Sequence, residues 1–105
     1  VSNSEVPAVG GASAMRFAAD GTLIDAYPIL TGTSINCAGG PTPWGTWLSC
    51  EEFLQGQVYE CDPYGVAAPV LRPALGRFQH EAAAVDWIHN HLFLTEDLPD
   101  GAFYR

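Results

Sequence analysis

Apolar and polar residues alternate along this chain in short segments, which is the pattern of strands with one buried face. The segments are bounded by glycine, proline and aspartate and recur about every 8–12 residues, a spacing typical of an all-β sandwich, barrel or propeller. The sequence therefore predicts an antiparallel meander of short strands. The predicted strands are Ala14–Ala18, Thr22–Tyr27, Ile29–Ile35, Thr46–Glu52, Gln57–Cys61, Ala67–Arg72, Ala82–Trp87, His91–Thr95 and Ala102–Arg105.

Turn residues join these strands. The pair Asp20–Gly21 is a strong hairpin signal, and Asp62–Gly65 reads Asp-Pro-Tyr-Gly, which is typical of a β-turn. Pro28 is expected to end a strand or to lie on a sheet edge. A short helix over Glu81–Ala84 is the alternative to a strand there, because three alanines favour it. The spacing of the surrounding meander favours the strand.

The 105 residues provide one domain of ordinary size. Residues 1–13 are polar at first and then rich in glycine, so we expect them to form a flexible lead-in. A propeller blade uses about 40–50 residues, so the chain would supply about two to two and a half blades, too few to close a ring. We therefore expect a partial propeller-like domain over residues 1–105, which is either a piece of a larger structure or completed by oligomerisation.

The charge is strongly negative, with twelve acidic residues against four arginines, no lysine and a formal net charge of −8. Such a surface repels nucleic-acid phosphates and anionic lipid head groups, so we expect neither nucleic acid nor a membrane as a partner. No apolar run approaches the roughly 18 residues of a membrane span, and no signal-peptide pattern is present. Clustered carboxylates are what calcium requires, although a solvated acidic surface is the simpler alternative.

The segment Asn36–Glu52 is the most unusual part of the sequence. It reads Asn-Cys-Ala-Gly-Gly-Pro-Thr-Pro-Trp-Gly-Thr-Trp-Leu-Ser-Cys-Glu-Glu. Its glycines and prolines exclude a helix in the first half and predict a rigid turn there. Its second half suits a strand. The segment would thus present a thiol on a turn and end a strand with two carboxylates. The alternative is a tight connection in which Trp44 and Trp47 serve for packing.

Three cysteines, an odd number, cannot all pair within the chain. Cys50 and Cys61 could be neighbours in one hairpin and form a disulfide, or both could be buried free thiols. Cys37 is the cysteine that we expect to remain unpaired.

Four groups of residues near strand ends could carry chemistry, and together they could gather at one rim of a β structure. They are Cys37, Glu51–Glu52, His80–Glu81 and Glu96–Asp97. Because side chains alternate along a strand, only one of Glu51 and Glu52 can face a given centre. Zinc-ligand spacings, a nucleophile elbow and a phosphate-binding glycine loop are all missing. The residues alone therefore predict an oxygen-rich metal site with one thiolate. Substitution of Glu52 would then weaken metal binding far more than substitution of Glu5.

Several of these segments resemble sequence signatures of PhoX-type alkaline phosphatases and their relatives. The order and spacing are similar over nearly the whole chain, from about Ala14 to Arg105. The resembling segments are Asn36–Glu52, Ala74–Glu81, Leu94–Asp97 and Asp100–Arg105. The resemblance implies a β-propeller that hydrolyses phosphomonoesters with an axial cluster of iron and calcium ions, in a periplasmic or secreted protein.

The resemblance also implies roles for individual residues. Cys37 is similar to the family's iron-binding cysteine, Glu52 (rather than Glu51) to a metal-binding carboxylate, and Glu81 to a second one. Glu96 and Asp97 are either ligands or turn residues, and His80 is interpreted as a packing residue or one that supports a ligand. The implied cofactors are Ca²⁺ and Fe³⁺, since carboxylates suit calcium and a soft thiolate suits iron.

The chain also departs from the family pattern. Family members are several times longer, and their remaining metal ligands and phosphate-contacting basic residues lie beyond the segments present here. Alone, the chain would lack a complete site. We therefore expect a phosphate ester as substrate only if copies of this chain or the remainder of a longer one complete the site. The competing hypotheses are a non-catalytic, self-assembling β module and a calcium-binding β domain.

Overall fold

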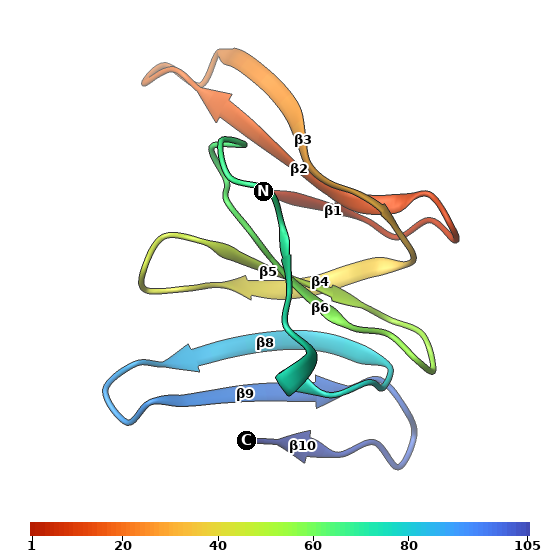
Figure 1. The fold of residues 1–105 in the computed structure, drawn as a ribbon. Coiled ribbons are helices and arrows are strands. Elements are labelled where there is room, and N and C mark those ends of the chain that lie inside the picture. Colours follow the sequence, from red (N-terminus) through yellow and green to blue (C-terminus); the bar gives the residue numbers. More distant parts are fainter.

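The computed structural model describes residues 1–105 and confirms the all-β fold class, with about half of the residues in strands. Ten strands form three antiparallel sheets, which lie one above another in Figure 1. The first sheet contains β1 (Ser2–Ser4), β2 (Gly10–Phe17) and β3 (Leu23–Thr33); the central sheet contains β4 (Asn36–Pro41), β5 (Trp47–Glu51), β6 (Val58–Cys61) and β7 (Val70–Leu71); the last sheet contains β8 (His80–Asp86), β9 (His91–Glu96) and β10 (Phe103–Tyr104). A 3₁₀ turn, Pro73–Leu75, is the one helical element, and no helix is long and apolar enough to cross a membrane.

Two apolar clusters hold the three sheets together. The first lies between the first and central sheets and the second between the central and last sheets, so the central sheet is covered on both faces. The first cluster contains Ala12, Ala14, Ile29, Leu30 and Cys61; the second contains Leu48, Cys50, Val58, Ala83 and Leu94. Full burial of one such leucine or valine contributes about 1.5–3 kcal/mol. This face-to-face stacking is compatible with propeller blades, and the three sheets do not close a ring.

All three cysteines lie in the central sheet and all are free, Cys37 as expected. Cys50 pairs with Val58 in the register of β5 and β6, whereas Cys61 pairs with Trp47. Cys50 belongs to the second apolar cluster and Cys61 to the first, so their side chains lie on opposite faces of the sheet. Burial raises the pKa of the Cys50 thiol to about 12 and that of the Cys61 thiol to about 11. The buried-thiol alternative is therefore the correct one.

The beginning of the chain differs from the expected flexible lead-in. Residues Ser2–Ser4 form β1, which pairs with β2, and β2 itself begins at Gly10. The Asn3 side chain holds this strand against the central sheet, because its Nδ2 donates to the carbonyl oxygens of Cys37 and Ala38. A polar strand anchored by one amide side chain has no apolar alternation, which is why the sequence pattern does not reveal it.

The segment expected to be a rigid turn is instead strand β4, with a register shift between Asn36 and Gly39. Its glycines allow other backbone segments to approach closely. A Cβ atom at Gly39 would lie 1.8 Å from the Leu48 carbonyl oxygen, and one at Gly40 would lie 1.9 Å from that of Ala83. The glycines therefore serve close strand packing and do not form the turn that the sequence predicts.

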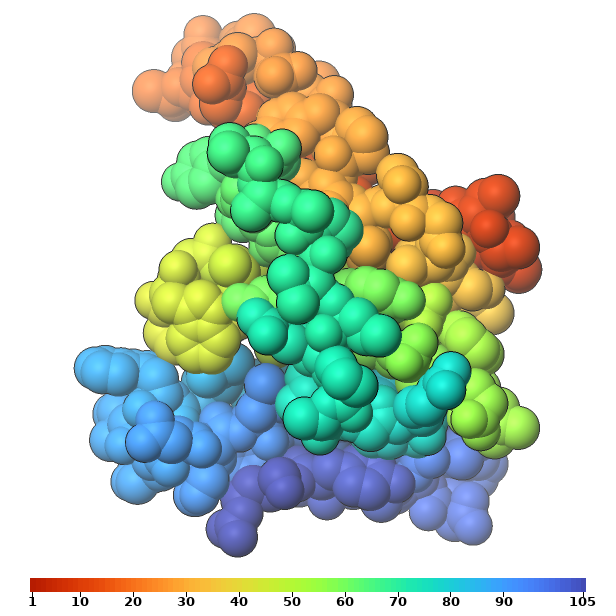
Figure 2. Space-filling view, in the orientation of Figure 1, coloured from red at the N-terminus to blue at the C-terminus, as the bar shows by residue number.

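Strand β3 joins two segments that the sequence predicts as separate strands, Thr22–Tyr27 and Ile29–Ile35. Pro28 lies inside it and is tolerated because β3 is an edge strand, as expected. After β6, the Asp62–Gly65 turn forms as predicted, with Asp62 accepting hydrogen bonds from three following backbone N–H groups. Residues 66–77 then cross the front of the stack to the last sheet (Figures 1 and 2).

Candidate metal centre

The candidate site begins at two strands of different sheets, β4 and β8, which lie side by side. Cys37 is the second residue of β4, and Glu81 is the second residue of β8. The Cys37 thiol donates to Glu81 Oε1 at 3.7 Å. Further along, Gly40 meets the backbone of Ala83, so both strands run in the same direction. The close packing at Gly40 therefore keeps the thiol and the carboxylate together.

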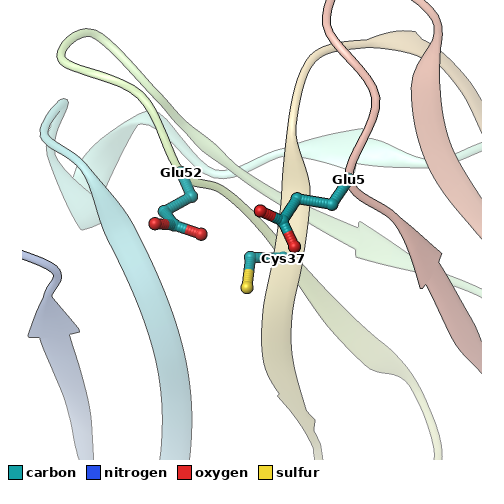
Figure 3. Close-up of side chains that lie close together, drawn as sticks. All are labelled: Glu5, Cys37 and Glu52. Atoms are coloured by element: carbon teal, nitrogen blue, oxygen red, sulfur yellow. The ribbon is translucent and has the colours of Figure 1, made fainter.

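Glu52 brings a second carboxylate to the thiol. It follows directly after β5, and its backbone N–H donates to the Ile35 carbonyl at 2.8 Å, which holds it beside the start of β4. Glu5, which follows β1, approaches from the other side. One ligand atom from each of Glu5, Cys37 and Glu52 lies within 4.8 Å of the others, and Figure 3 shows the three side chains turned toward one another.

Asp97 completes a second group around Glu52. One carboxylate oxygen from each of Glu52, Glu81 and Asp97 lies within 4.8 Å of the others. The Asp97 N–H donates to the Gln79 carbonyl at 3.1 Å, which fixes the residue after β9 beside the entry to β8. Glu52 belongs to both groups. We refer to Glu5, Cys37, Glu52, Glu81 and Asp97 as the Cys37 cluster.

Two candidate carboxylates lie outside the Cys37 cluster. Glu51 is buried and accepts hydrogen bonds from the backbone N–H groups of Ser34 (2.9 Å) and Gln57 (3.1 Å). Its side chain points away from Glu52, as alternation along β5 predicts. Glu96 accepts from the Ala102 N–H at 3.1 Å and from the Tyr104 hydroxyl at 3.0 Å, and so ties β10 to β9. Both carboxylates are therefore occupied by structural hydrogen bonds.

His80 is fully buried, and its ring packs at a tilt of 33° against the Phe78 ring with 3.6 Å between ring centroids. Its Nε2 lies 3.3 Å from the Gly76 carbonyl oxygen, which makes Nε2 the protonated nitrogen. Burial lowers the pKa of its imidazole, so the ring is neutral near pH 7. These surroundings are those of a packing residue that fixes the start of β8 beside Glu81.

No basic side chain neutralises the Cys37 cluster. The two ion pairs of the structure, Arg72–Glu60 and His89–Asp86, lie elsewhere. Burial and the neighbouring carboxylates of Glu52 and Glu81 raise the pKa of the Cys37 thiol. For Glu52, the neighbouring Cys37 thiol lowers the pKa of the carboxyl group, but burial, Asp97 and Glu81 together outweigh this effect and raise that pKa. The assembled groups therefore favour a bound proton or cation over mutual repulsion.

The donor atoms fit the implied metals. The group of Glu5, Cys37 and Glu52 offers one sulfur and two carboxylates, a mixed set that suits iron. The group of Glu52, Glu81 and Asp97 offers oxygen alone, which suits a hard cation such as calcium.

Glu5 is the member of the cluster that sequence reasoning missed. It lies in a polar segment without strand periodicity, so the sequence predicts that Glu5 contributes far less to metal binding than Glu52. The structure places its carboxylate beside Cys37 and Glu52, so Glu5 is not a valid control for Glu52. A solvated acidic residue and one folded against a thiol look the same in a sequence.

The fold and the cluster define an all-β protein with acidic and thiol groups gathered where its sheets meet. The family model described as alkaline phosphatase PhoX matches residues 6–58 and 54–105, which is nearly the whole chain. The chain therefore belongs to the PhoX alkaline phosphatase family, as its signature segments indicate. No curated protein and no solved structure matches it significantly. Of the Cys37 cluster, only Glu5 falls outside the matched residues.

Proposed function

We propose that this chain forms part of a metal-dependent phosphomonoesterase and contributes metal ligands from Cys37, Glu52 and Glu81. The observation that carries the proposal is the convergence of these three side chains, from β4, the end of β5 and β8, without any neutralising cation. Membership of the PhoX family supports the phosphatase chemistry. Asp97 is a further ligand in this proposal, whereas Glu51 and Glu96 are structural.

The two ligand groups differ in chemistry, and we assign them to different metals. Cys37 with Glu5 and Glu52 would hold Fe³⁺, and Glu52, Glu81 and Asp97 would hold Ca²⁺. Bound there, the ions would neutralise phosphate charge and polarise the ester, which an acidic protein cannot do unaided. The chain's own contribution is to fix the ligands: Asn3 anchors β1 beside β4, and the Glu52 N–H is held by Ile35.

Metal analysis tests the proposal directly. The purified chain is incubated with Ca²⁺ and Fe³⁺, desalted and analysed for both elements, and hydrolysis of p-nitrophenyl phosphate is followed in parallel. We expect wild-type protein to retain metal and Glu52→Gln to retain neither ion. Asp25→Asn is the matched control, because Asp25 is exposed on β3 and its Oδ1 contacts only the adjacent Ala26 N–H. Equal metal content in wild type and Glu52→Gln would refute the ligand assignment.

A second candidate, a self-assembling β module, rests on the outer faces of the stack. Met15, Phe17 and Leu23 of the first sheet are 44%, 54% and 52% exposed. On the last sheet Phe93 and Phe103 stack 5.4 Å apart, and Phe103 is 69% exposed. Because these two apolar faces differ, one copy could place its last sheet on the first sheet of another, a heterologous contact.

Light scattering after size-exclusion chromatography tests this second candidate. We expect a mass above that of one chain and a shift toward the monomer for Phe103→Glu. Val66→Glu is the control, because Val66 is 88% exposed and lies between β6 and β7 of the central sheet, outside the two outer sheets. A monomeric wild type would rule out self-assembly and leave the metal-ligand proposal standing.

A further inference from the structure

A cavity of about 480 Å³ lies at the other end of the strands that carry the Cys37 cluster. Its walls come from two hairpins, the β4–β5 turn and the β8–β9 turn, which lie next to each other at the left of Figure 2. Cys37 is near the start of β4, and Trp44 follows its end; six or seven extended residues span on the order of 20 Å. The cavity is therefore separate from the Cys37 cluster. Its lining is Pro43, Trp44, Val85, Trp87, Asn90, His91 and Leu92.

Trp44 is held in place as an aromatic wall of this cavity. Its indole Nε1 donates to Glu60 Oε1 at 2.6 Å, and the same oxygen accepts from the Thr46 hydroxyl. The other Glu60 oxygen accepts from Arg72 Nε at 2.7 Å. The N–H edge of the indole is thus satisfied and its position fixed, while 59% of the residue remains exposed. A ligand would meet the ring face, which is electron-rich.

Trp87 lines the same cavity from the β8–β9 turn, which is itself ordered. Asp86 Oδ1 accepts from the backbone N–H groups of Ile88 (3.1 Å) and His89 (3.3 Å), and Asn90 adopts a left-handed conformation with φ 55°. Trp87 is 65% exposed. Both indoles line the cavity, one from each hairpin. The cavity volume falls within the range of about 300–1,000 Å³ for small-molecule sites.

The lining indicates the charge of the ligand. It contains no lysine or arginine and includes the imidazole of His91 and the amide of Asn90, and the whole chain carries a net charge of −8. An anion would be repelled and left without a donor of positive charge. An organic cation would be attracted by the protein's field and by two indole faces, and aromatic walls are the usual recognition element for quaternary ammonium groups.

We propose that this cavity binds a small organic ammonium ion of the quaternary type, in contact with the indoles of Trp44 and Trp87. Binding there needs no metal and no residue of the Cys37 cluster, so this proposal stands apart from the phosphatase proposal. The contacts are the two ring faces and the apolar side chains of Pro43, Val85 and Leu92.

Isothermal titration with choline chloride tests the proposal, with 3,3-dimethyl-1-butanol as the uncharged ligand of the same shape. We expect choline to bind at least about tenfold more tightly than the alcohol, and Trp87→Ala to weaken choline binding by about tenfold. Ile88→Ala is the matched control: Ile88 is the next residue, is 71% exposed and does not line the cavity, so its affinity should equal that of wild type.

Three results would overturn the proposal. Equal affinity for choline and the alcohol would show an apolar pocket without cation selectivity and overturn the proposal. Absence of choline binding, or equal binding by Trp87→Ala and wild type, would overturn it as well. Circular dichroism of Trp87→Ala shows whether the variant is folded. Trp44→Phe, which keeps an aromatic face but loses the indole N–H, gives a second test, since it should bind choline more weakly than wild type and more tightly than Trp44→Leu.

Discussion

At the residue scale, carboxylates that look equivalent in the sequence have different expected roles in metal binding, because they lie at different places relative to the Cys37 cluster. Glu52 belongs to both groups, whereas Glu5 belongs to the thiol group and Glu81 to the all-carboxylate group. Glu81 also lies beside the thiol, since its Oε1 is 3.7 Å from the Cys37 Sγ. Glu51, the direct neighbour of Glu52, is fully used by two backbone N–H groups. The position of a carboxylate relative to the thiol, and not its place in an acidic pair, therefore determines its expected role.

This arrangement predicts a graded series of variants. Glu52→Gln should abolish binding of both Fe³⁺ and Ca²⁺, because it removes an anionic oxygen from each group. Glu81→Gln should weaken Ca²⁺ binding by at least tenfold and Glu5→Gln should weaken Fe³⁺ binding, each with a smaller effect on the other ion. Titration of each variant with each ion measures the affinities. A Glu5→Gln variant as defective for Ca²⁺ as Glu81→Gln would contradict the division into two groups.

At the element scale, Gly40 determines how closely β4 and β8 approach each other at the candidate metal centre. Gly40 of β4 meets the Ala83 carbonyl of β8, and a Cβ atom there would lie only 1.9 Å from its oxygen. Backbone atoms cannot move aside as the end of a flexible side chain can. The spacing of β4 and β8, and with it the distance between Cys37 and Glu81, therefore depends on residue 40 being a glycine, which has no Cβ atom.

Gly40→Ala is expected to lower the free energy of unfolding by about 3 kcal/mol or more, because the added methyl group overpacks a rigid contact. Urea denaturation measures the loss. Gly45→Ala is the control: Gly45 has φ 89° but nothing within 4 Å of a new Cβ atom, so strain alone should cost about 1 kcal/mol. Equal losses in the two variants would show that the close approach of β4 to β8 does not limit stability.

The Glu60 carboxylate links residues next to β5 and β7 to β6, and its contribution to the stability of the fold should depend on pH. Burial raises the pKa of Glu60. Hydrogen bonds from Thr46, Trp44 and Arg72 lower that pKa by a larger amount, so the net shift is downward. A carboxyl group with a lowered folded-state pKa stabilises the fold above its unfolded-state value near 4.5 and loses that contribution as pH falls through the folded-state pKa.

Glu60→Gln should therefore be less stable than wild type by about 1.5–3 kcal/mol at pH 7, the usual contribution of hydrogen bonds to a charged group. The difference should shrink as the pH falls below 4.5. Denaturation of both proteins between pH 7 and pH 3 measures it. A difference that stays constant across this range would show that the ionised form of Glu60 contributes nothing.

The strands and hairpins were predictable from sequence because alternation and turn residues act over a few neighbouring positions. Asp20–Gly21 and Asp62–Gly65 form the expected turns, and β6 divides Val58 and Cys61 between two apolar clusters as its period predicts. Strands β1 and β4 were missed because long-range contacts create them. Asn3 bonds to residues more than 30 positions away, and Gly39 and Gly40 are needed where distant backbones meet.

The candidate site was predictable only in part for the same reason. Cys37, Glu52, Glu81 and Asp97 stand near strand ends or in recognisable segments, and the structure brings them together. Glu96 and Glu51 satisfy the same sequence criteria, yet hydrogen bonds within the fold occupy them. Glu5 carries no local signal. The packing of the three sheets determines which carboxylates accept hydrogen bonds within the fold and which remain available to a cation. That packing is long-range, so local sequence patterns do not reveal it.

At the scale of the whole molecule, the Cys37 cluster joins all three sheets. Glu5 belongs to the segment after β1 of the first sheet, Cys37 and Glu52 to the central sheet, and Glu81 and Asp97 to the last. The native fold holds these carboxylates together, but the unfolded chain lets them separate. A cation that binds the cluster would therefore bind the folded state alone and shift the unfolding equilibrium toward it.

Calcium should consequently raise the melting temperature of the chain, and a chelator should lower it again. At a free Ca²⁺ concentration of about 100 times Kd, the gain is about 2.7 kcal/mol, which corresponds to about 10 °C or more for a domain near 100 residues. Scanning calorimetry with Ca²⁺, with chelator and with Na⁺ at equal ionic strength separates specific binding from charge screening. Asp25→Asn should keep the shift and Glu52→Gln should lose it. A shift of equal size in Na⁺, or in Glu52→Gln, would mean that calcium merely screens the net charge of −8, because screening acts on every carboxylate and needs no particular one.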